Sequence, residues 1–242
     1  MKKVAVTIVF VLALSLTVSG KEKKTKPWTQ WSGKEAQKIL NDSPWGQTQV
    51  EADISEMFYT PTSSRSSAAR GERGAFNQSI PLNFRIRLLS AKPIRQAFAR
   101  LIESQQKVPN KQLSDSLQSF VERKFDQYIV VTVDYDSPTD DRRVSGPVMQ
   151  MFNSSIADVL RNNTYIETKN GKRLFLQDYK PPAADGLGAK FIFARLVDGQ
   201  PFLEPDSGEL RFYSDLSSLA KGLVLNMRFK LSDMMYEGIL EY

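Results

Sequence analysis

The amino-acid sequence predicts an α+β fold, with a mixed or antiparallel sheet, about four helices and a β meander in the C-terminal third. Three observations support this class. Apolar residues recur with the spacing of one helix face in several segments of the first two thirds. Apolar and polar residues alternate in other segments, as in half-buried strands. From Tyr165 onward the chain consists of short strand patterns separated by turn signals.

The first helix is expected to begin after Ser32. Ser32 and Glu35 have the spacing of a capping box, in which each side chain accepts a hydrogen bond from a backbone N–H of the first turn. Pro44 disfavours helical backbone in the residue before it, so the helix should end by that point. The inward-facing residues of this helix are Ala36, Ile39 and Leu40.

Three strands are expected in the first half of the chain. In residues 48–55 every second residue is apolar, at Val50, Ala52 and Ile54. This alternation predicts a half-buried strand. In residues 82–88 apolar residues alternate with a polar outer face made of Asn83, Arg85 and Arg87. Residues 128–133 are apolar without alternation, so they are expected to form a central strand covered on both faces.

Three further helices follow from the apolar spacing. Ser90 is the expected N-cap of one helix, which has Pro93 in its first turn. The inward stripe of the next helix is Leu113, Leu117, Phe120, Val121 and Phe125. The last helix is expected over residues 147–161, with an inward stripe of Val148, Phe152, Ile156, Val159 and Leu160.

The C-terminal third is expected to be a series of strands. Asn170-Gly171 is a strong hairpin signal, because both residues tolerate the positive φ of a tight turn. Asp198-Gly199 is a second turn signal. The strands are expected at residues 165–169, 172–177, 190–197, 210–213, 223–231 and 238–242.

The first twenty residues have the pattern of a signal peptide. A basic start at Lys2 and Lys3 precedes an apolar run over residues 4–18, shorter than the ~20 residues that a membrane-spanning helix needs. Val18 and Gly20 are small residues at the positions that precede cleavage. An uncleaved anchor is the alternative. We expect a periplasmic or secreted protein whose mature form does not span the membrane.

The expected domain organisation follows from this pattern. Residues 1–20 are the signal peptide, residues 21–26 a flexible leader, and residues 27–242 a single α+β domain. Removal of Lys2 and Lys3 lowers the formal charge from +6 to +4. The remaining basic residues are spread along the chain, whereas nucleic-acid-binding proteins usually concentrate them, so no nucleic-acid partner is expected.

The sequence contains neither cysteine nor histidine. Disulfides, thiol nucleophiles and zinc–thiolate sites are therefore excluded, as are serine triads and other chemistry that needs an imidazole. We expect a non-catalytic binding or scaffolding protein without a cofactor, whose partner is an envelope protein or a glycan. The alternatives are a carboxylate-dependent hydrolase of an envelope polymer and a calcium-stabilised module.

All three tryptophans, Trp28, Trp31 and Trp45, lie close to the first helix. One interpretation is an aromatic platform that binds a glycan or a partner protein. The other is that the rings attach the first helix to the sheet. The sequence leaves both interpretations open.

Four carboxylates follow the expected central strand, and such oxygen ligands suit Ca²⁺. They are Asp134, Asp136, Asp140 and Asp141. An EF-hand loop starting at Asp134 would need glycine where Thr139 stands and glutamate where Ser145 stands, so that motif is excluded. The alternative to a calcium site is a solvated acidic turn.

The string from Trp28 to Trp45, with the pattern Trp-x-x-Trp-Ser-x-Lys-Glu-Ala-x-Lys-Ile-Leu-x-x-Ser-Pro-Trp, resembles the opening of a group of uncharacterised exported bacterial proteins. The segment from Met234 to Tyr242 is similar to the same group. The resemblance implies export and one shared fold over most of the mature chain. It implies no activity and no functional residues.

Overall fold

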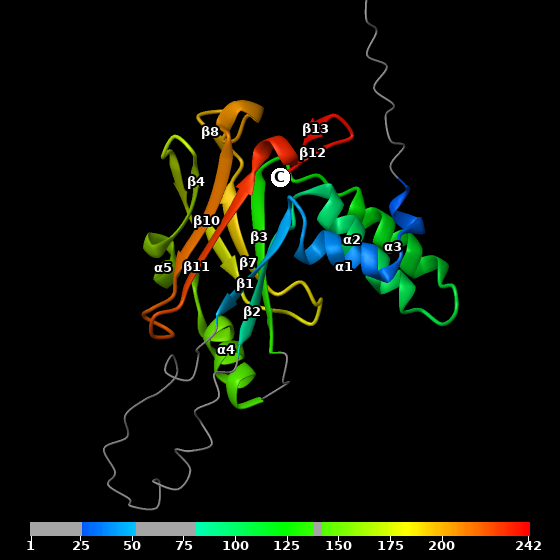
Figure 1. The fold of residues 1–242 in the computed structure, drawn as a ribbon, viewed down its shortest axis with the longest axis horizontal. Helices are drawn as coiled ribbons and strands as arrows, with labels where there is room; N and C mark the ends of the chain where they lie inside the picture. The colour runs from blue at the N-terminus through cyan, green and yellow to red at the C-terminus, as the bar shows by residue number, and fades with distance from the viewer. Residues whose placement is uncertain (1–25, 52–80, 138–141) are drawn as a thin grey trace, which may run out of the picture.

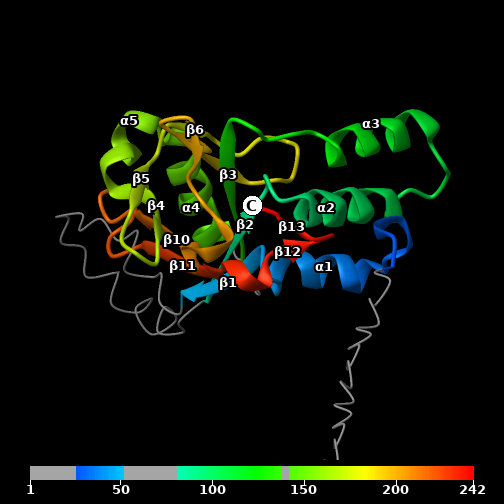
Figure 2. The same ribbon diagram turned by 90° about the horizontal axis from the view of Figure 1, so that it is seen from above.

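The computed structural model describes residues 26–51, 81–137 and 142–242. Two antiparallel sheets pack face to face, and a group of helices lies on the outer side of one of them (Figures 1 and 2). The helices are α1 (Gly33–Asn41), α2 (Lys92–Ser104), α3 (Lys111–Val121), α4 (Arg142–Ser154) and α5 (Ala157–Leu160). The α+β class is confirmed. The expected signal peptide lies outside the described residues.

The first sheet has five strands in the order β1-β2-β3-β7-β6, all antiparallel. Its strands are β1 (Gly46–Glu51), β2 (Leu82–Leu88), β3 (Tyr128–Asp136), β7 (Ala189–Ala194) and β6 (Asp178–Lys180). The apolar run after residue 127 is the central strand, as its composition predicts. Residues 129–133 are all buried. The second sheet covers one face of β3, and the helices together with the β6–β7 connection lie on the other side (Figure 1).

The second sheet has four strands in the order β11-β10-β4-β5. Its strands are β11 (Val224–Lys230), β10 (Glu209–Asp215), β4 (Thr164–Thr168) and β5 (Arg173–Phe175). The predicted hairpin at Asn170-Gly171 joins β4 to β5, with Gly171 at φ 80°. The C-terminal strands are divided between the two sheets, because the chain crosses from β5 to β6 after residue 175.

Short two-residue strands complete the structure. They form two small hairpins, β8 (Leu196–Val197) with β9 (Gln200–Pro201), and β12 (Met235–Tyr236) with β13 (Ile239–Leu240). The turn between β8 and β9 is the predicted Asp198-Gly199 turn, in which both residues have positive φ. In the described ranges, no helix has the length and apolar character needed to cross a membrane.

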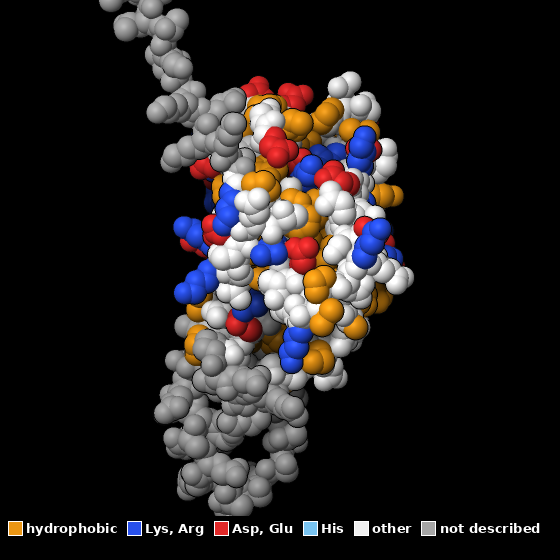
Figure 3. Space-filling model, turned by 90° about the vertical axis from the view of Figure 1, so that its right-hand side faces the viewer, with side chains coloured by type: hydrophobic (Ala, Val, Ile, Leu, Met, Phe, Trp, Pro, Cys, Tyr) orange, Lys and Arg blue, Asp and Glu red, His pale blue; other side chains and the backbone are white. Residues whose placement is uncertain are grey.

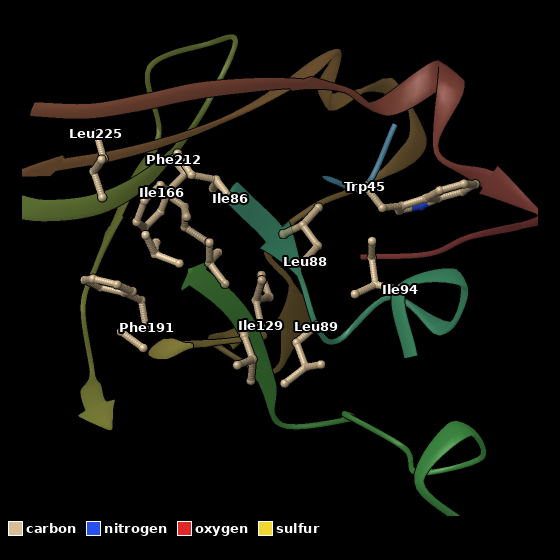
Figure 4. Packing of buried hydrophobic residues seen from close by; sticks show 14 of the residues in the cluster. Trp45, Ile86, Leu88, Leu89, Ile94, Ile129, Ile166, Phe191, Phe212 and Leu225 are labelled. Atoms are coloured by element: carbon tan, nitrogen blue, oxygen red, sulfur yellow. The ribbon is translucent and has the colours of Figure 1, made fainter. Parts of the chain in front are cut away.

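The core between the two sheets is rich in aromatic rings. Phe191 and Phe193 of β7 contact Phe212 of β10, with ring centroids 5.4 and 6.3 Å apart in edge-to-face geometry. Ile166 of β4 and Leu225 of β11 point into the same space (Figure 4). All five side chains are fully buried, so the alternating residues of both sheets supply one shared core.

Side-chain amides join the two sheets at the edge where β1 lies beside β11. The Gln49 amide nitrogen donates to the Val224 carbonyl oxygen (2.7 Å), and the Gln49 carbonyl oxygen accepts from the Asn226 N–H (2.8 Å). One glutamine thus replaces the peptide group of a neighbouring strand. The expected inward face of this strand is wrong at Val50, which is 59% exposed, because Gln47 and Gln49 face the second sheet instead. Ala52 and Ile54 lie outside the described residues.

A buried arginine connects β2 to the end of α1. Arg87 donates to the Leu40 carbonyl oxygen (3.0 Å) and to Asn41 Oδ1 (2.9 Å), and its guanidinium lies over the Phe98 ring. Burial lowers the pKa of Arg87 to about 10, although Asp134 opposes the shift. The predicted polar outer face of β2 is therefore wrong at Arg87, which is 3% exposed because the helices cover it.

The sequence predicts the N-terminal cap of α1 but not that of α2. The Ser32–Glu35 capping box of α1 is present as predicted. The expected cap of α2 is wrong, because α2 begins after Ala91 and the Ser90 hydroxyl instead accepts from the Val130 N–H (3.1 Å).

The helix expected over residues 147–161 is wrong in its length. It is divided into α4 and α5, which are separated by Ser155 and Ile156. The Ser155 hydroxyl donates to the Met151 carbonyl oxygen (2.7 Å), and such local hydrogen bonds compete with continuation of a helix. Ile156 and Val159, expected to be buried, are 57% and 47% exposed.

Candidate functional site

A cavity of about 460 Å³ lies on the outer face of the five-stranded sheet, beside the C-terminal end of α3. Its floor is formed by Val130 and Ile192, which lie opposite each other on β3 and β7. The β6–β7 connection, residues 181–188, projects from the sheet on the helical side and supplies another wall (Figure 2). Apolar pockets of this size, with a few polar groups, are typical of small-molecule sites.

The helical wall of this pocket is fixed in place by two arginines. Phe125 lines the pocket, and the Arg95 guanidinium lies 5.0 Å from its ring centroid. Arg95 also donates to the Val121 carbonyl oxygen at the end of α3 (3.1 Å), while Arg195 Nε donates to the Phe125 carbonyl oxygen (2.7 Å). Burial lowers the pKa of Arg95 to about 10. These contacts attach the wall to α2 and to Arg195, the residue that follows β7.

The opposite wall is a loop that depends on Gly188. This residue has φ +80°, and a Cβ atom placed there would lie 2.4 Å from the Val133 carbonyl oxygen. Lys190 Nζ contacts Asp185 Oδ2 (2.8 Å), and the Leu187 N–H donates to Asp185 Oδ1 (3.0 Å). The loop therefore lies tightly against β3, and Leu187 forms part of the pocket lining.

The charged groups around the pocket are paired, with one exception. Asp178 contacts Lys180 (2.8 Å), and Asp185 contacts Lys190 (2.8 Å). Arg123, which lines the pocket just after α3, is exposed, and its guanidinium forms no hydrogen bond or ion pair with any residue that the structure describes. The pocket thus combines apolar walls with one unpaired cation.

Both carboxyl groups in the pocket lining are held in the ionised form. The hydrogen bond from Lys180 holds the pKa of Asp178 below its usual value. Burial acts to raise the pKa of Asp185, but hydrogen bonds from Lys190 and the Leu187 N–H lower it overall. An acid/base pair needs two pKa values that are shifted apart, and these two shift in the same direction.

A second, more open hollow of about 730 Å³ lies between the end of α1 and β11. Its lining is mostly polar and includes Lys38, Asp42, Arg228 and Asp233.

On the helical side of the molecule, Figure 3 shows basic and acidic side chains interspersed with uncharged ones, so the described residues of this face form no patch of a single charge.

The structure places all three tryptophans against the hydrophobic core. Trp31 and Trp45 are 8% and 9% exposed, and Trp28 packs partly buried against the core. The Trp31 indole N–H donates to the Lys26 carbonyl oxygen (2.9 Å), and the Trp45 indole N–H donates to the Glu241 carbonyl oxygen (2.9 Å). These contacts attach the chain on either side of α1. A glycan-binding role for the three rings stays a prediction.

The structure places two of the four candidate calcium ligands next to arginines. Arg85 contacts both Asp134 (3.3 Å) and Asp136, and Arg87 lies 3.7 Å from Asp134. Asp140 and Asp141 lie outside the described residues. Within the described part of the chain, no group of three or more acidic residues is arranged to hold a metal ion. Calcium binding stays a prediction, which a fall in melting temperature on chelation would support.

The pocket could not be found from the sequence, because its lining comes from distant segments. Val130 and Ile192 read as ordinary buried strand residues, and Phe125 as a helix-stripe residue. The one local signal is the Gly186-Leu187-Gly188 sequence, which indicates a loop but does not indicate that the loop contacts β3.

Searches of protein-family models, curated proteins and solved structures found no match to this chain.

Proposed function

We propose that this is an exported bacterial envelope protein that acts as a non-catalytic binding domain, with its ligand site in the pocket beside α3. The observation that carries the proposal is the pocket itself, an apolar floor of Val130 and Ile192 between two walls that hydrogen bonds and ion pairs hold in place. A site that is already formed loses little conformational entropy on binding.

The alternative, a hydrolase that uses two carboxylates, has less support. Such an enzyme needs one protonated carboxylic acid beside one carboxylate. Asp178 and Asp185 both have lowered pKa values, so both are ionised near neutral pH. We also propose a glycan or an envelope protein as a partner that binds outside this pocket. The polar hollow between the end of α1 and β11 would suit such a partner.

The binding proposal is tested with a pocket-filling variant. Ile192→Trp places a large ring over the pocket floor, whereas Val50→Trp adds the same ring at an exposed position on the same face of the sheet. Anilinonaphthalene sulfonate, an apolar fluorescent anion, is the probe. Saturable binding to the wild type and to Val50→Trp, with loss in Ile192→Trp, is the expected result. Equal binding to all three proteins would contradict the proposal.

The export proposal has a separate test. Mass spectrometry of the protein purified from the periplasm or medium of an expressing bacterium should give an N-terminus at Lys21. Recovery from the cytosol with residues 1–20 attached would contradict it.

A further inference from the structure

We propose that the pocket beside α3 binds a monoanionic amphiphile, an apolar chain that carries one carboxylate or one phosphodiester group, whose anionic group contacts Arg123. This inference rests on the proposed function, because it names the ligand class of the same pocket. It depends on three features of the described residues: the apolar floor, the internal pairing of the carboxylates, and the unpaired guanidinium at the rim.

The apolar part of the ligand follows from the lining. Val130 and Ile192 form a continuous apolar strip across β3 and β7, and Phe120, Phe125 and Leu187 stand around it. The gain on binding would come from removal of apolar surface from water, about 0.8 kcal/mol for each buried methylene. A hydroxyl-rich ligand would leave most of its polar groups without partners against these walls.

The sign of the ligand's charge follows from the pairing. A cationic ligand would compete with Lys180 for Asp178 and with Lys190 for Asp185, since both carboxylates already have a lysine within 2.8 Å. An anion meets Arg123 without displacing any contact among the described residues. The planar guanidinium donates two parallel hydrogen bonds to a carboxylate or a phosphate, which also orients the head group.

The orientation of the ligand follows from the positions of the two parts. Arg123 is exposed, two residues after the end of α3, whereas Val130 is 6% exposed on the floor. The anionic group would therefore stay at the solvent side while the chain lies inward. This arrangement avoids burial of an ionised group, which is costly without full pairing.

The test uses straight-chain probes of 6 to ~12 carbons, as carboxylates and as the matching primary alcohols, below their micelle concentrations. With the wild type, carboxylate affinity should rise up to about fourfold per methylene until the pocket is filled. Each carboxylate should bind about fivefold more tightly than its alcohol, and this preference should shrink at high salt.

Matched variants assign the preference to one residue. Arg123→Gln should remove the preference for carboxylate while leaving alcohol binding unchanged, and Arg123→Lys should retain part of it. Lys124→Gln removes the same charge one residue along the chain, outside the pocket lining, and should keep the preference. Dodecanoate and a lysophosphatidylglycerol with the same twelve-carbon chain distinguish a free fatty acid from a lipid as the source of the anionic chain, and the tighter probe identifies it.

The outcomes separate the two proposals. Equal binding of carboxylates and alcohols in both the wild type and Arg123→Gln would overturn the inference and leave the binding pocket standing. Binding of neither probe series to the wild type would overturn the proposed site together with the inference.

Discussion

The Glu241 carboxylate accepts a hydrogen bond from the backbone N–H of Lys92, the first residue of α2, at 2.8 Å. The same residue accepts the Trp45 indole N–H through its backbone carbonyl oxygen (2.9 Å). A carboxylate at a helix N-terminus satisfies an unpaired donor and interacts favourably with the helix dipole. Glu241 therefore supplies the cap that the sequence around Ser90 does not.

Replacement of Glu241 by alanine is expected to lower the free energy of unfolding by about 1–2 kcal/mol, because the helix start loses both its acceptor and its negative charge. Glu241→Gln keeps an acceptor and loses only the charge, so its effect should be smaller. Urea denaturation of both variants measures this. Unchanged stability in Glu241→Ala would show that the contact contributes nothing.

The capping box of α1 predicts a pH dependence. Hydrogen bonds from the Ser32 backbone and side chain, with a smaller contribution from Lys26, lower the pKa of Glu35 from 4.5 to about 2. The folded state favours the ionised carboxyl, so this contribution to stability is complete above about pH 4.5 and is lost as the pH falls toward 2.

Glu35→Gln should therefore flatten stability over that pH range, because the amide keeps the hydrogen bond without titrating. Carboxyl NMR titration of the wild type should place the Glu35 midpoint near 2, and Lys26→Met should raise it only in part. A midpoint near 4.5 in the wild type would contradict the prediction.

Two buried threonines should respond in opposite directions to the same substitution. The Thr132 hydroxyl oxygen has no hydrogen-bond partner among the described residues, whereas Thr164 Oγ1 pairs with Ser214 Oγ at 2.8 Å. Both side chains are fully buried. Thr132→Val should raise stability by about 1 kcal/mol, because it removes an unpaired polar group from the interior.

Thr164→Val should lower stability by about 1–3 kcal/mol, because it leaves the Ser214 hydroxyl unpaired. Thermal and chemical denaturation of the two variants under identical conditions give the comparison. A loss of stability of similar size in both would contradict the assignment at Thr132.

The pocket loop offers a matched pair of glycines. Gly186 and Gly188 both have positive φ, but only Gly188 faces backbone atoms closer than 3 Å to an added Cβ. Gly186→Ala should cost about 1 kcal/mol for the left-handed conformation alone. Gly188→Ala should cost clearly more and should weaken ligand binding, since the loop must move away from Val133. Similar stability and affinity in both variants would contradict this account of the wall.

Local signals in the sequence predict the elements whose causes are local. The Ser32–Glu35 box, the Asn170-Gly171 turn and the apolar central strand each occupy a few consecutive residues, and the structure confirms all three. The division of the last long helix also has a local signal, the polar run Asn153-Ser154-Ser155, because the Ser155 hydroxyl hydrogen-bonds a backbone carbonyl where the helix ends.

Features that depend on contacts between distant segments have no local signal in the sequence, so the sequence does not predict them. The burial of Arg87 depends on the end of α1, and the exposure of Val50 depends on the partners that Gln49 finds on β11. The pocket belongs to the same category, because Arg123 and Lys190 are brought together only by the pairing of β3 with β7. Periodicity reports which residues are apolar, but not which element covers them.

The contacts of Glu241 also constrain the timing of folding. The residue follows Lys92 by 149 positions and Trp45 by 196. At a synthesis rate of about 5–20 residues per second, the ribosome delivers the cap of α2 on the order of ten seconds after the helix itself. Until then α2 lacks the acceptor for its first N–H, and the Trp45 indole lacks its partner, so both regions reach their final hydrogen bonding only when the end of the chain has been made.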